Sequence, residues 1–552
     1  MIAVTYFVVV LSAALAGAQT ATSSASSFKI TAEISLDDYW NEMVGPVSVA
    51  AVNTTVSPTP VASSELIPPP TLHYPAFPTG QEIPAMSKNE SWKFPKDFWW
   101  GVSSAAYQVE GAVKDEGRGP SIWDVLTHRA TNYVSLNETG DIADNQYYLY
   151  KQDIARIAAL GVKVYSFSIS WSRVFPFGSG QVNEQALRHY DDVIQSCYDA
   201  GVEPALTLYH WDLPLGLMNK YNGWLDEQIV DDFVAYAEVA FKRWGQKVQK
   251  WYTVNEPIVF CQEYPYPVGY WKSTSIAPKD QQFYCGHHVL LAHARAYHLA
   301  KSLGVKGTVA FKNNGGYKIP LTNSSADAEA VQRAWDFNEG WFADPIYLTG
   351  DYPATVKEHV SSLGLKFTDE QKRMIKGTAD HFAHDAYTSQ FYMAPDDGLE
   401  SCISNSSNPL YPSCANTTYT YPAVDGGWNA TDWVPQFLRY IQQKWKPKGG
   451  IVVSEFGFSE PFEALKTIRA DIQFDFVRSQ YYHDYMRAIL MAIAEGTNVV
   501  GCLAWSLVDN LEWAQGYTVK FGMQYVNLTT QERYYKASFF EYVNAFKVYQ
   551  EK

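Results

Sequence analysis

The sequence predicts an α/β protein in which parallel strands are joined by crossover helices. From residue 94 onward, short apolar runs alternate with amphipathic stretches, without an abrupt change in composition. Segments 162–169 and 202–209 have the character of buried strands, and 185–200 between them has helical periodicity and ends before Gly201. Two architectures fit this alternation, a closed (β/α)8 barrel and a doubly wound open sheet.

Other segments continue the same alternation. Helices are expected at 229–244 and 479–494, and strands at 248–254, 307–312, 381–386, 450–454 and 501–505. No Gly-x-Gly-x-x-Gly follows a strand, so a dinucleotide site has no support. The spacing of Cys and His residues does not suggest a metal site either. We therefore expect neither a cofactor nor a metal.

Charge and composition narrow the class of function. The chain has 552 residues, a formal net charge of −15 and an aromatic share of 15%. Phosphate backbones and anionic lipids repel so acidic a protein, which makes nucleic acid and membrane surfaces poor partners. Aromatic rings fill cores, and they also stack on the apolar faces of sugars. Composition is thus compatible with a small sugar as the partner, and it leaves a homodimer open.

The first 92 residues differ from the rest. Residues 2–15 are almost wholly apolar and precede Ala16-Gly17-Ala18, which predicts a signal peptide at 1–18 and a secreted, extracellular protein. Residues 19–92 form a Ser/Thr/Pro-rich N-terminal extension, and 93–552 form the main folded domain. A helical turn at 36–40 offers the alternative that the extension docks, but the favoured interpretation is a solvated stalk.

Cysteines and glycosylation motifs agree with secretion. Cys197 and Cys502 lie in apolar stretches and are expected to be free buried thiols. Two other pairs each flank a polar or Pro-rich loop and are candidate disulfides: Cys261 with Cys285, and Cys402 with Cys414. Eight Asn-x-Ser/Thr motifs are candidate glycosylation sites: Asn53, Asn89, Asn137, Asn323, Asn405, Asn416, Asn429 and Asn527.

Polar and aromatic residues follow several of the predicted strands. His210-Trp211-Asp212 follows 202–209, Asn255-Glu256-Pro257 follows 248–254, and Glu455 follows 450–454. One such glutamate alone would be read as a helix cap or a solvated loop residue. Two glutamates beside amide, imidazole and indole groups are what glycoside hydrolysis needs. One carboxyl protonates the leaving oxygen and the other meets the developing cation.

These segments belong to an ordered series of motifs. The series resembles the glycoside hydrolase family 1 β-glucosidases and β-galactosidases, most closely the secreted fungal members, from Phe94 to about Tyr549. A lone Asn-Glu-Pro would be a weak signal, whereas this series in order is a strong one. Its landmarks include Ser104-Ala105-Ala106-Tyr107-Gln108-Val109-Glu110-Gly111, Arg118-Gly119-Pro120-Ser121-Ile122-Trp123-Asp124, Ser168-Ile169-Ser170-Trp171-Ser172-Arg173, Thr253-Val254-Asn255-Glu256-Pro257 and Asp509-Asn510-Leu511-Glu512-Trp513.

The resemblance implies a (β/α)8 TIM barrel whose active site lies at the C-terminal ends of the strands, and a retaining mechanism. Glu256 matches the acid/base and Glu455 the nucleophile, with carboxyl groups roughly 5–5.5 Å apart. The implied activity releases terminal non-reducing β-D-glucose, and also β-D-galactose, from oligosaccharides and aryl or alkyl glycosides. The expected substrate-binding residues are Gln108, His210, Trp211, Asn255, Tyr387, Trp505, Glu512 and Trp513.

Three residues around the nucleophile depart from the family pattern. Phe456 replaces the asparagine of the usual Thr-Glu-Asn-Gly, Ser166 stands where most members have arginine, and Asp385 stands where most have asparagine. That arginine normally lowers the pKa of the nucleophile through its opposite charge. Its absence leaves the nucleophile without one cationic partner. Asp385 then either shares a proton with Glu455 or pairs with a base from elsewhere, and we expect a rate optimum at acidic pH.

A few residues distinguish this chain from relatives that have other functions on the same fold. Glu256 argues against thioglucosidase relatives, which carry Gln there, and Trp513-Ala514-Gln515 lacks the basic cradle of phosphoglycosidases. A carbohydrate-binding or cell-wall protein is the non-enzyme alternative. The sequence leaves open the choice between glucosides and galactosides, the leaving group, and the balance between hydrolysis and transglycosylation.

Overall fold

The computed structural model describes residues 34–68, 86–87, 89–263, 274–421 and 430–552. The predicted signal peptide at 1–18 and the glycosylation motif at Asn429 lie outside these residues. Within the described ranges, none of the helices has both the length and the apolar character that a membrane span requires.

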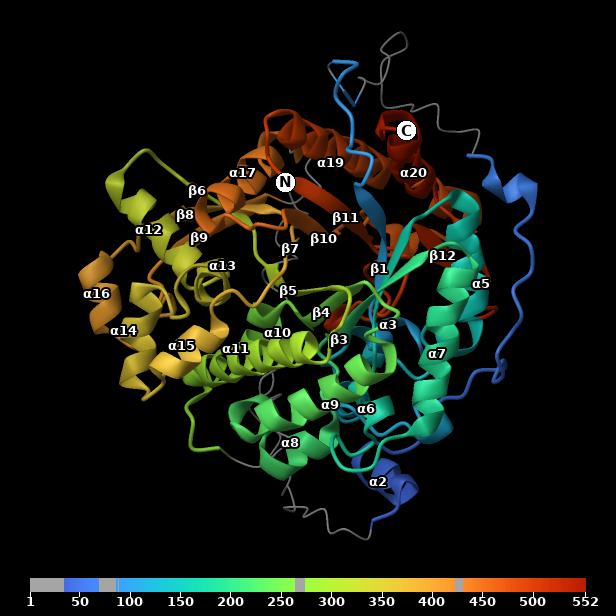
Figure 1. Ribbon diagram of the computed structural model, residues 1–552, viewed down its shortest axis with the longest axis horizontal. Coiled ribbons are helices and arrows are strands. Elements are labelled where there is room, and N and C mark those ends of the chain that lie inside the picture. Colours follow the sequence, from blue (N-terminus) through green and yellow to red (C-terminus); the bar gives the residue numbers. More distant parts are fainter. Residues whose placement is uncertain (1–33, 69–85, 88, 264–273, 422–429) are drawn as a thin grey trace.

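Eight parallel strands close into a barrel in the order β1-β11-β10-β7-β5-β4-β3-β2 (Figure 1). This arrangement confirms the (β/α)8 barrel and rules out the open sheet. The strands of the barrel are β1 (Trp99–Ser104), β2 (Val164–Ser168), β3 (Glu203–Tyr209), β4 (Lys250–Asn255), β5 (Thr308–Asn314), β7 (Phe382–Asp385), β10 (Ile451–Phe456) and β11 (Val499–Trp505).

The first of these strands is the one that the apolar pattern does not predict. Gly101 lies in its middle, and a Cβ there would come within 1.8 Å of the carbonyl oxygen of Val164 on β2. Only glycine permits this close approach, and a glycine within so short a run weakens the strand signal. The other seven strands overlap their predicted segments, with ends that differ by a few residues.

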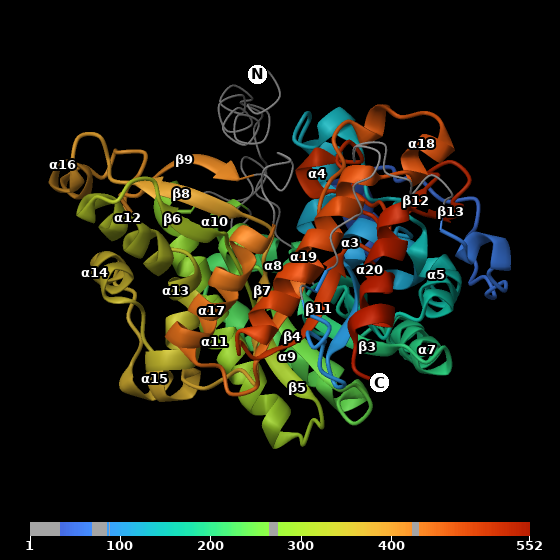
Figure 2. The ribbon, with the colours of Figure 1, turned by 90° about the horizontal axis from the view of Figure 1, so that it is seen from above.

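Helices surround the barrel (Figure 1), and Figure 2 shows the same ribbon turned by 90°. Helix α7 ends at Asp199, and Gly201 follows in the left-handed conformation with φ 72°, as expected for a helix stop. The α-helices are α2 (Leu36–Met43), α3 (Ala106–Val109), α4 (Ile122–Arg129), α5 (Gln146–Leu160), α6 (Trp171–Val174), α7 (Glu184–Asp199), α8 (Leu215–Tyr221), α9 (Gln228–Trp244), α10 (Pro257–Glu263), α11 (Pro278–Ser302), α12 (Ser325–Asp336), α13 (Glu339–Ala343), α14 (Ala354–Ser362), α15 (Asp369–Ile375), α16 (Leu399–Ser404), α17 (Val434–Trp445), α18 (Arg469–Gln473), α19 (Phe476–Ala494) and α20 (Ala537–Tyr549).

The barrel interior is filled by inward-facing side chains, because residues alternate between the two faces of each strand. One buried cluster inside the barrel consists of Val164, Ala205, Tyr252, Ala310, Ala383 and Leu503. A much larger apolar core lies between the strands and the surrounding helices. On β2, β5 and β7 the residues two positions further along are therefore the ones that face the C-terminal mouth of the barrel.

Residues 34–68, here called the N-terminal strap, pack against the catalytic domain beside α5 and α7 (Figure 1). Ser35 caps helix α2, in which Tyr39 and Trp40 are fully buried. Further along, Glu65 forms an ion pair of 2.9 Å with Arg156 on α5. The favoured expectation of a solvated stalk is therefore wrong for these residues. The apolar surface of two aromatic rings, which the overall Ser/Pro-rich composition hides, accounts for the docking.

Both predicted disulfides are formed. Cys261–Cys285 joins α10 to α11, and Cys402–Cys414 joins α16 to the end of the loop that follows it. Cys197 and Cys502 are free and buried, as expected. That second disulfide lies beside a small sheet of order β6-β8-β9, which consists of β6 (Tyr317–Pro320), β8 (Ser389–Met393) and β9 (Asn416–Tyr421). A separate hairpin pairs β12 (Gln524–Val526) with β13 (Arg533–Tyr535).

The described glycosylation motifs lie at accessible positions. Asn53, Asn89, Asn137, Asn323 and Asn405 are exposed, and Asn416 and Asn527 are partly exposed.

Candidate active site

Glu256 follows β4 directly and precedes α10, at the C-terminal end of the barrel. Its carboxyl group is 5% exposed, and its backbone N–H donates to the carbonyl oxygen of Lys312 at 3.2 Å. The side-chain amide of Asn314 donates to Oε1 of Glu256. Burial raises the pKa of Glu256 well above its usual value, and the charges of Asp385 and Glu455 raise it further. Glu256 is thus suited to hold a proton.

Glu455 lies on β10 and faces the same space, with an exposed fraction of 3%. Each of its carboxylate oxygens accepts one hydrogen bond. Lys312 Nζ donates to Oε1 at 2.9 Å, and Tyr387 Oη donates to Oε2 at 3.0 Å. Donors of this kind hold a carboxylate in a fixed orientation.

The two glutamates lie close to each other and to a third carboxyl group. Single carboxylate oxygens of Glu256, Asp385 and Glu455 all lie within 4.8 Å of one another. Retaining glycosidases have their two carboxyl groups about 5–5.5 Å apart, whereas inverting enzymes leave about 6.5–9.5 Å for a water molecule. The separation between Glu256 and Glu455 therefore fits a nucleophile and an acid, not a base that activates water across the sugar.

Asp385 is fully buried at the end of β7. Burial raises the pKa of this carboxyl well above its usual value, and the charge of Glu455 adds to the effect. Ser454 Oγ donates to Oδ1 at 2.6 Å, and Oδ2 has no hydrogen-bond partner among the described residues. Lys312 is a base that faces Asp385, but its hydrogen bond goes to Glu455 and not to Asp385, so the ion pair that the sequence left open for Asp385 is made by Glu455 instead.

A second group of polar residues lies next to the glutamates. Gln108 Nε2 donates to the carbonyl oxygen of Leu511 at 2.8 Å and lies 3.4 Å from Oε2 of Glu512. Burial raises the pKa of Glu512 to about 8, and the charge of Glu455 contributes. A neutral carboxyl beside an amide offers both donors and acceptors, which is what sugar hydroxyls require.

His210 and Asn255 form the opposite part of this group. Asn255 Nδ2 and His210 Nε2 are 3.2 Å apart, and Trp211 Nε1 donates to the carbonyl oxygen of Asn255 at 3.0 Å. Burial lowers the pKa of His210 well below its usual value, and the positive charge of Lys312 lowers it further. The imidazole is therefore neutral and available as a hydrogen-bond partner.

Indole rings form a wall beside these polar groups. The ring of Trp513 lies 4.6 Å from that of Trp211 and 4.7 Å from that of Trp123. The ring of Trp505 lies 5.8 Å from the imidazole of His210. Trp211 and Trp513 have positive φ angles of 72° and 46°, and Glu256 has φ 45°. Residues other than glycine rarely adopt a positive φ angle unless the surrounding structure imposes it.

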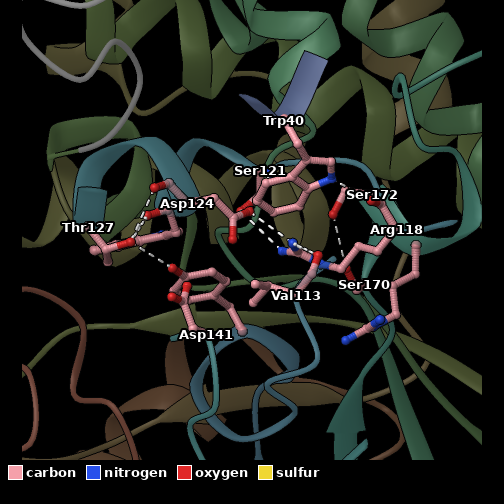
Figure 3. A network of polar contacts seen from close by, with 12 residues as sticks. Trp40, Val113, Arg118, Ser121, Asp124, Thr127, Asp141, Ser170 and Ser172 are labelled. Carbon is pink, nitrogen blue, oxygen red and sulfur yellow. Dashed lines mark hydrogen bonds and ion pairs between the residues drawn. The ribbon is translucent and has the colours of Figure 1, made fainter. Parts of the chain in front are cut away.

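A polar network links Trp40 of the N-terminal strap to Asp124 on helix α4 (Figure 3). Trp40 Nε1 donates to the carbonyl oxygen of Arg118 at 2.8 Å, and Arg118 Nη1 donates to Oδ2 of Asp124 at 3.0 Å. The same Asp124 oxygen accepts from the backbone N–H and the hydroxyl of Ser121 at the start of α4. Helix α4 carries Trp123, so the strap is connected to the indole wall through two residues.

All ten predicted catalytic and sugar-binding residues lie at the C-terminal mouth of the barrel. Two residues of the site, Lys312 and Asn314 on β5, are absent from that set. The signal that could have found them is a lysine near the end of an otherwise apolar strand, because a buried lysine needs an acidic partner.

Comparison with known proteins places this geometry in a family. Residues 90–550 match the model of glycosyl hydrolase family 1. The chain belongs to glycosyl hydrolase family 1. Family members similar to it include β-glucosidase 12 of rice, 35% identical over 81% of this chain and 91% of the relative, and a coniferin β-glucosidase of Pinus contorta, 34% identical over 81% and 90%.

Solved structures of family 1 members have the same fold. A rice β-glucosidase matches with a TM-score of 0.75 and 33% identity, covering 83% of this chain and 99% of that structure. A β-glucosidase of Trichoderma harzianum matches with a TM-score of 0.76 and 32% identity, covering 85% and 100%. Plant and fungal members are thus about equally similar, and the comparison does not single out the fungal subgroup that the motifs resemble.

Proposed function

We propose that the protein is a retaining exo-β-glycosidase that releases terminal β-D-glucose from oligosaccharides and aryl or alkyl glycosides. The observation that carries this proposal is the pair of glutamates, whose carboxylate oxygens lie within 4.8 Å in unlike surroundings. Glu256 has a raised pKa, whereas Glu455 accepts hydrogen bonds from an ammonium and a phenol. The relatives named β-glucosidases support the same activity.

The reaction divides between the two glutamates. The Glu455 carboxylate attacks the anomeric carbon while protonated Glu256 gives its proton to the glycosidic oxygen. The bond between the anomeric carbon and the glycosidic oxygen breaks, and a covalent glycosyl-enzyme forms. Glu256, now ionised, takes a proton from water, which attacks the anomeric carbon and releases Glu455. Two displacements return the sugar in its original β configuration.

The residues around the glutamates are proposed to hold the terminal sugar. Gln108, His210, Asn255 and Glu512 supply hydrogen-bonding groups for its hydroxyls, and Trp505 and Trp513 cover its ring. Glucose and galactose differ in the orientation of the 4-hydroxyl, and Gln108 with Glu512 offers donors and acceptors to either. We therefore expect activity on both, with glucosides slightly favoured.

The activity is tested with four substrates: aryl β-glucoside, aryl β-galactoside, cellobiose and lactose. The ratios of kcat/KM rank the sugars and the leaving groups, and NMR of the first-formed sugar shows its anomer. Release of the β anomer supports the double displacement, and release of the α anomer excludes it. A rise in transfer products with added acceptor sugar measures transglycosylation.

The roles of the glutamates are tested with an activated 2-fluoro β-glucoside, which slows both steps and lets the covalent intermediate accumulate. We expect a mass increase of one glycosyl unit that maps to the peptide containing Glu455, and no label in Glu455→Gln. Glu256→Gln should hydrolyse substrates with good leaving groups far better than cellobiose. A protein that binds glucose but turns over none of the four substrates would be the carbohydrate-binding alternative.

We further propose that the protein is secreted. The apolar segment before Gln19 and the two disulfides support this, because disulfides persist in oxidising compartments. Expression in a eukaryotic host tests it. We expect the protein in the medium with Gln19 as its first residue and with glycans at the accessible motifs, whereas retention inside the cell with residues 1–18 attached contradicts it.

A further inference from the structure

The cation that faces Glu455 comes from a different strand than the family pattern would lead one to expect. The residue at the family's arginine position, Ser166 on β2, is buried and uncharged. Lys312 on β5 is 1% exposed and reaches Glu455 with a nitrogen–oxygen distance of 2.9 Å. A positive charge is thus missing at one place in the barrel and present at another.

Both places belong to the same layer of side chains inside the barrel. Val164, Ala310 and Ala383 lie in the buried cluster within the barrel. Side chains repeat their direction every two residues along a strand, so Ser166, Lys312 and Asp385 follow them in the next layer toward the mouth. A side chain in this layer can reach the centre of the site from any strand. A lysine on β5 can therefore serve the carboxylate that an arginine on β2 would serve.

The charges around Lys312 make this position more than a chance contact. Burial lowers the pKa of its ammonium, but the charges of Glu455, Asp385 and Glu256 outweigh burial and raise it. The ammonium also lies 5.1 Å from the ring centre of Tyr252, which packs beneath it. The titratable groups that face it are Glu455, Asp385, Glu256, Tyr252 and His210.

We infer that Lys312 is a positioning residue that takes the place of the family's arginine: its ammonium contacts Oε1 of Glu455 and aims this carboxylate at the anomeric carbon. One ammonium among three buried carboxyl groups balances one negative charge. Lys312 donates its hydrogen bond to Glu455, whereas burial raises the pKa of Asp385 and that of Glu256 well above their usual values. Asp385 then presents a neutral side chain where relatives have the neutral asparagine.

The inference rests on the proposed function, and the test separates the two. Lys312→Met keeps an unbranched chain of similar length and removes the charge. We expect kcat on an aryl β-glucoside to fall about 10²–10³-fold, the range seen when one preorganised charge-stabilising group is removed. The inhibition constant of glucose should change little, because Lys312 contacts Glu455 and is not among the groups proposed to bind hydroxyls.

The pH profile is the decisive measurement. Lys312→Met removes the positive charge that contacts Oε1 of Glu455, so the acidic limb of kcat/KM should move to higher pH in this variant. Lys312→Arg keeps the charge and should leave that limb near its original position even where kcat is reduced. Trapping by the 2-fluoro β-glucoside should be slow in Lys312→Met and faster in Lys312→Arg.

The matched control is Lys318→Met. Lys318 on β6 is also fully buried and paired with a glutamate, Glu339, but it makes no contact with Glu455. Lys318→Met should destabilise the fold without moving the acidic limb of kcat/KM. Should Lys312→Met not fold, Lys312→Met combined with Asp385→Asn removes a buried acid along with the base and gives the same limb shift.

An acidic limb that stays in place in Lys312→Met, or that moves equally in Lys318→Met, overturns the role of Lys312. In either case wild-type activity on the aryl β-glucoside still stands. Absence of wild-type activity instead overturns the proposed function.

Discussion

The side-chain amide of Asn314 donates a hydrogen bond to Oε1 of Glu256, across the boundary between β5 and the end of β4. An amide donor favours the ionised form of a carboxyl group and so lowers its pKa. In Glu256 this bond acts against burial, which raises the pKa. The proton affinity of this carboxyl is thus set by opposing contributions, and each can be changed by mutation.

Removal of the amide should extend activity to higher pH. In Asn314→Ala the pKa of Glu256 rises further, so the proposed acid keeps its proton longer and the alkaline limb of kcat/KM moves upward. We expect kcat to fall about tenfold from poorer orientation of the acid. Asn314→Asp adds a negative charge and should shift the limb further in the same direction. A limb that moves down in either variant contradicts this account.

The rate optimum of the unmodified protein is expected on the acidic side of neutrality. The first step needs protonated Glu256, whose pKa is raised, and activity is lost as pH rises through that pKa. Initial rates on an aryl β-glucoside across the pH range give the profile. A rate that does not fall at alkaline pH would be incompatible with protonated Glu256 as the acid.

Glu512 should bind sugar as a neutral carboxyl. Its pKa is raised to about 8, so the group carries its proton throughout the acidic range. At about pH 5, Glu512→Gln resembles the protonated acid and should weaken inhibition by glucose less than about tenfold, whereas Glu512→Ala loses hydrogen bonds and should weaken it by about tenfold to a hundredfold. Equal losses in the two variants would show that the charged form binds.

The N-terminal strap should contribute measurably to stability. Trp40 is fully buried and donates to Arg118, so Trp40→Ala should lower the free energy of unfolding by about 3–5 kcal/mol. Val49→Ala is the control, because Val49 lies on the same strap and is 66% exposed. Urea unfolding followed by fluorescence measures both. Coincident unfolding curves for Trp40→Ala and the unmodified protein would show that the strap does not contribute to the stability of the fold.

Much of the fold follows from local pattern, and the exceptions have physical causes. Apolar runs predict seven strands of the barrel, because fully buried parallel strands are apolar on both faces. Strand β1 is not predicted, because the close approach of its backbone to Val164 requires Gly101 in the middle of the strand. The docking of the strap is not predicted either, because it depends on two buried rings in α2 within a segment whose overall composition is polar.

Some residues of the site can be predicted from the sequence and others cannot. Residues within ordered motifs, such as Glu256 and Glu512, are found from sequence because each motif carries its own signal. Lys312 is not, because its meaning depends on Glu455, 143 residues further along the chain. The missing arginine indicates that something near the nucleophile has changed. Only the closure of the barrel shows which strand supplies the replacement.

The left-handed backbone of Glu256, with φ 45°, has a consequence for evolution and engineering. Such a conformation costs about 1–3 kcal/mol in a residue with a side chain, and Trp211 and Trp513 beside it share the condition. Glycine would relieve the strain at each of these positions and abolish the chemistry or the sugar wall. Selection for heat tolerance alone would therefore tend to erode this pocket, and libraries screened for stability need an activity screen beside it.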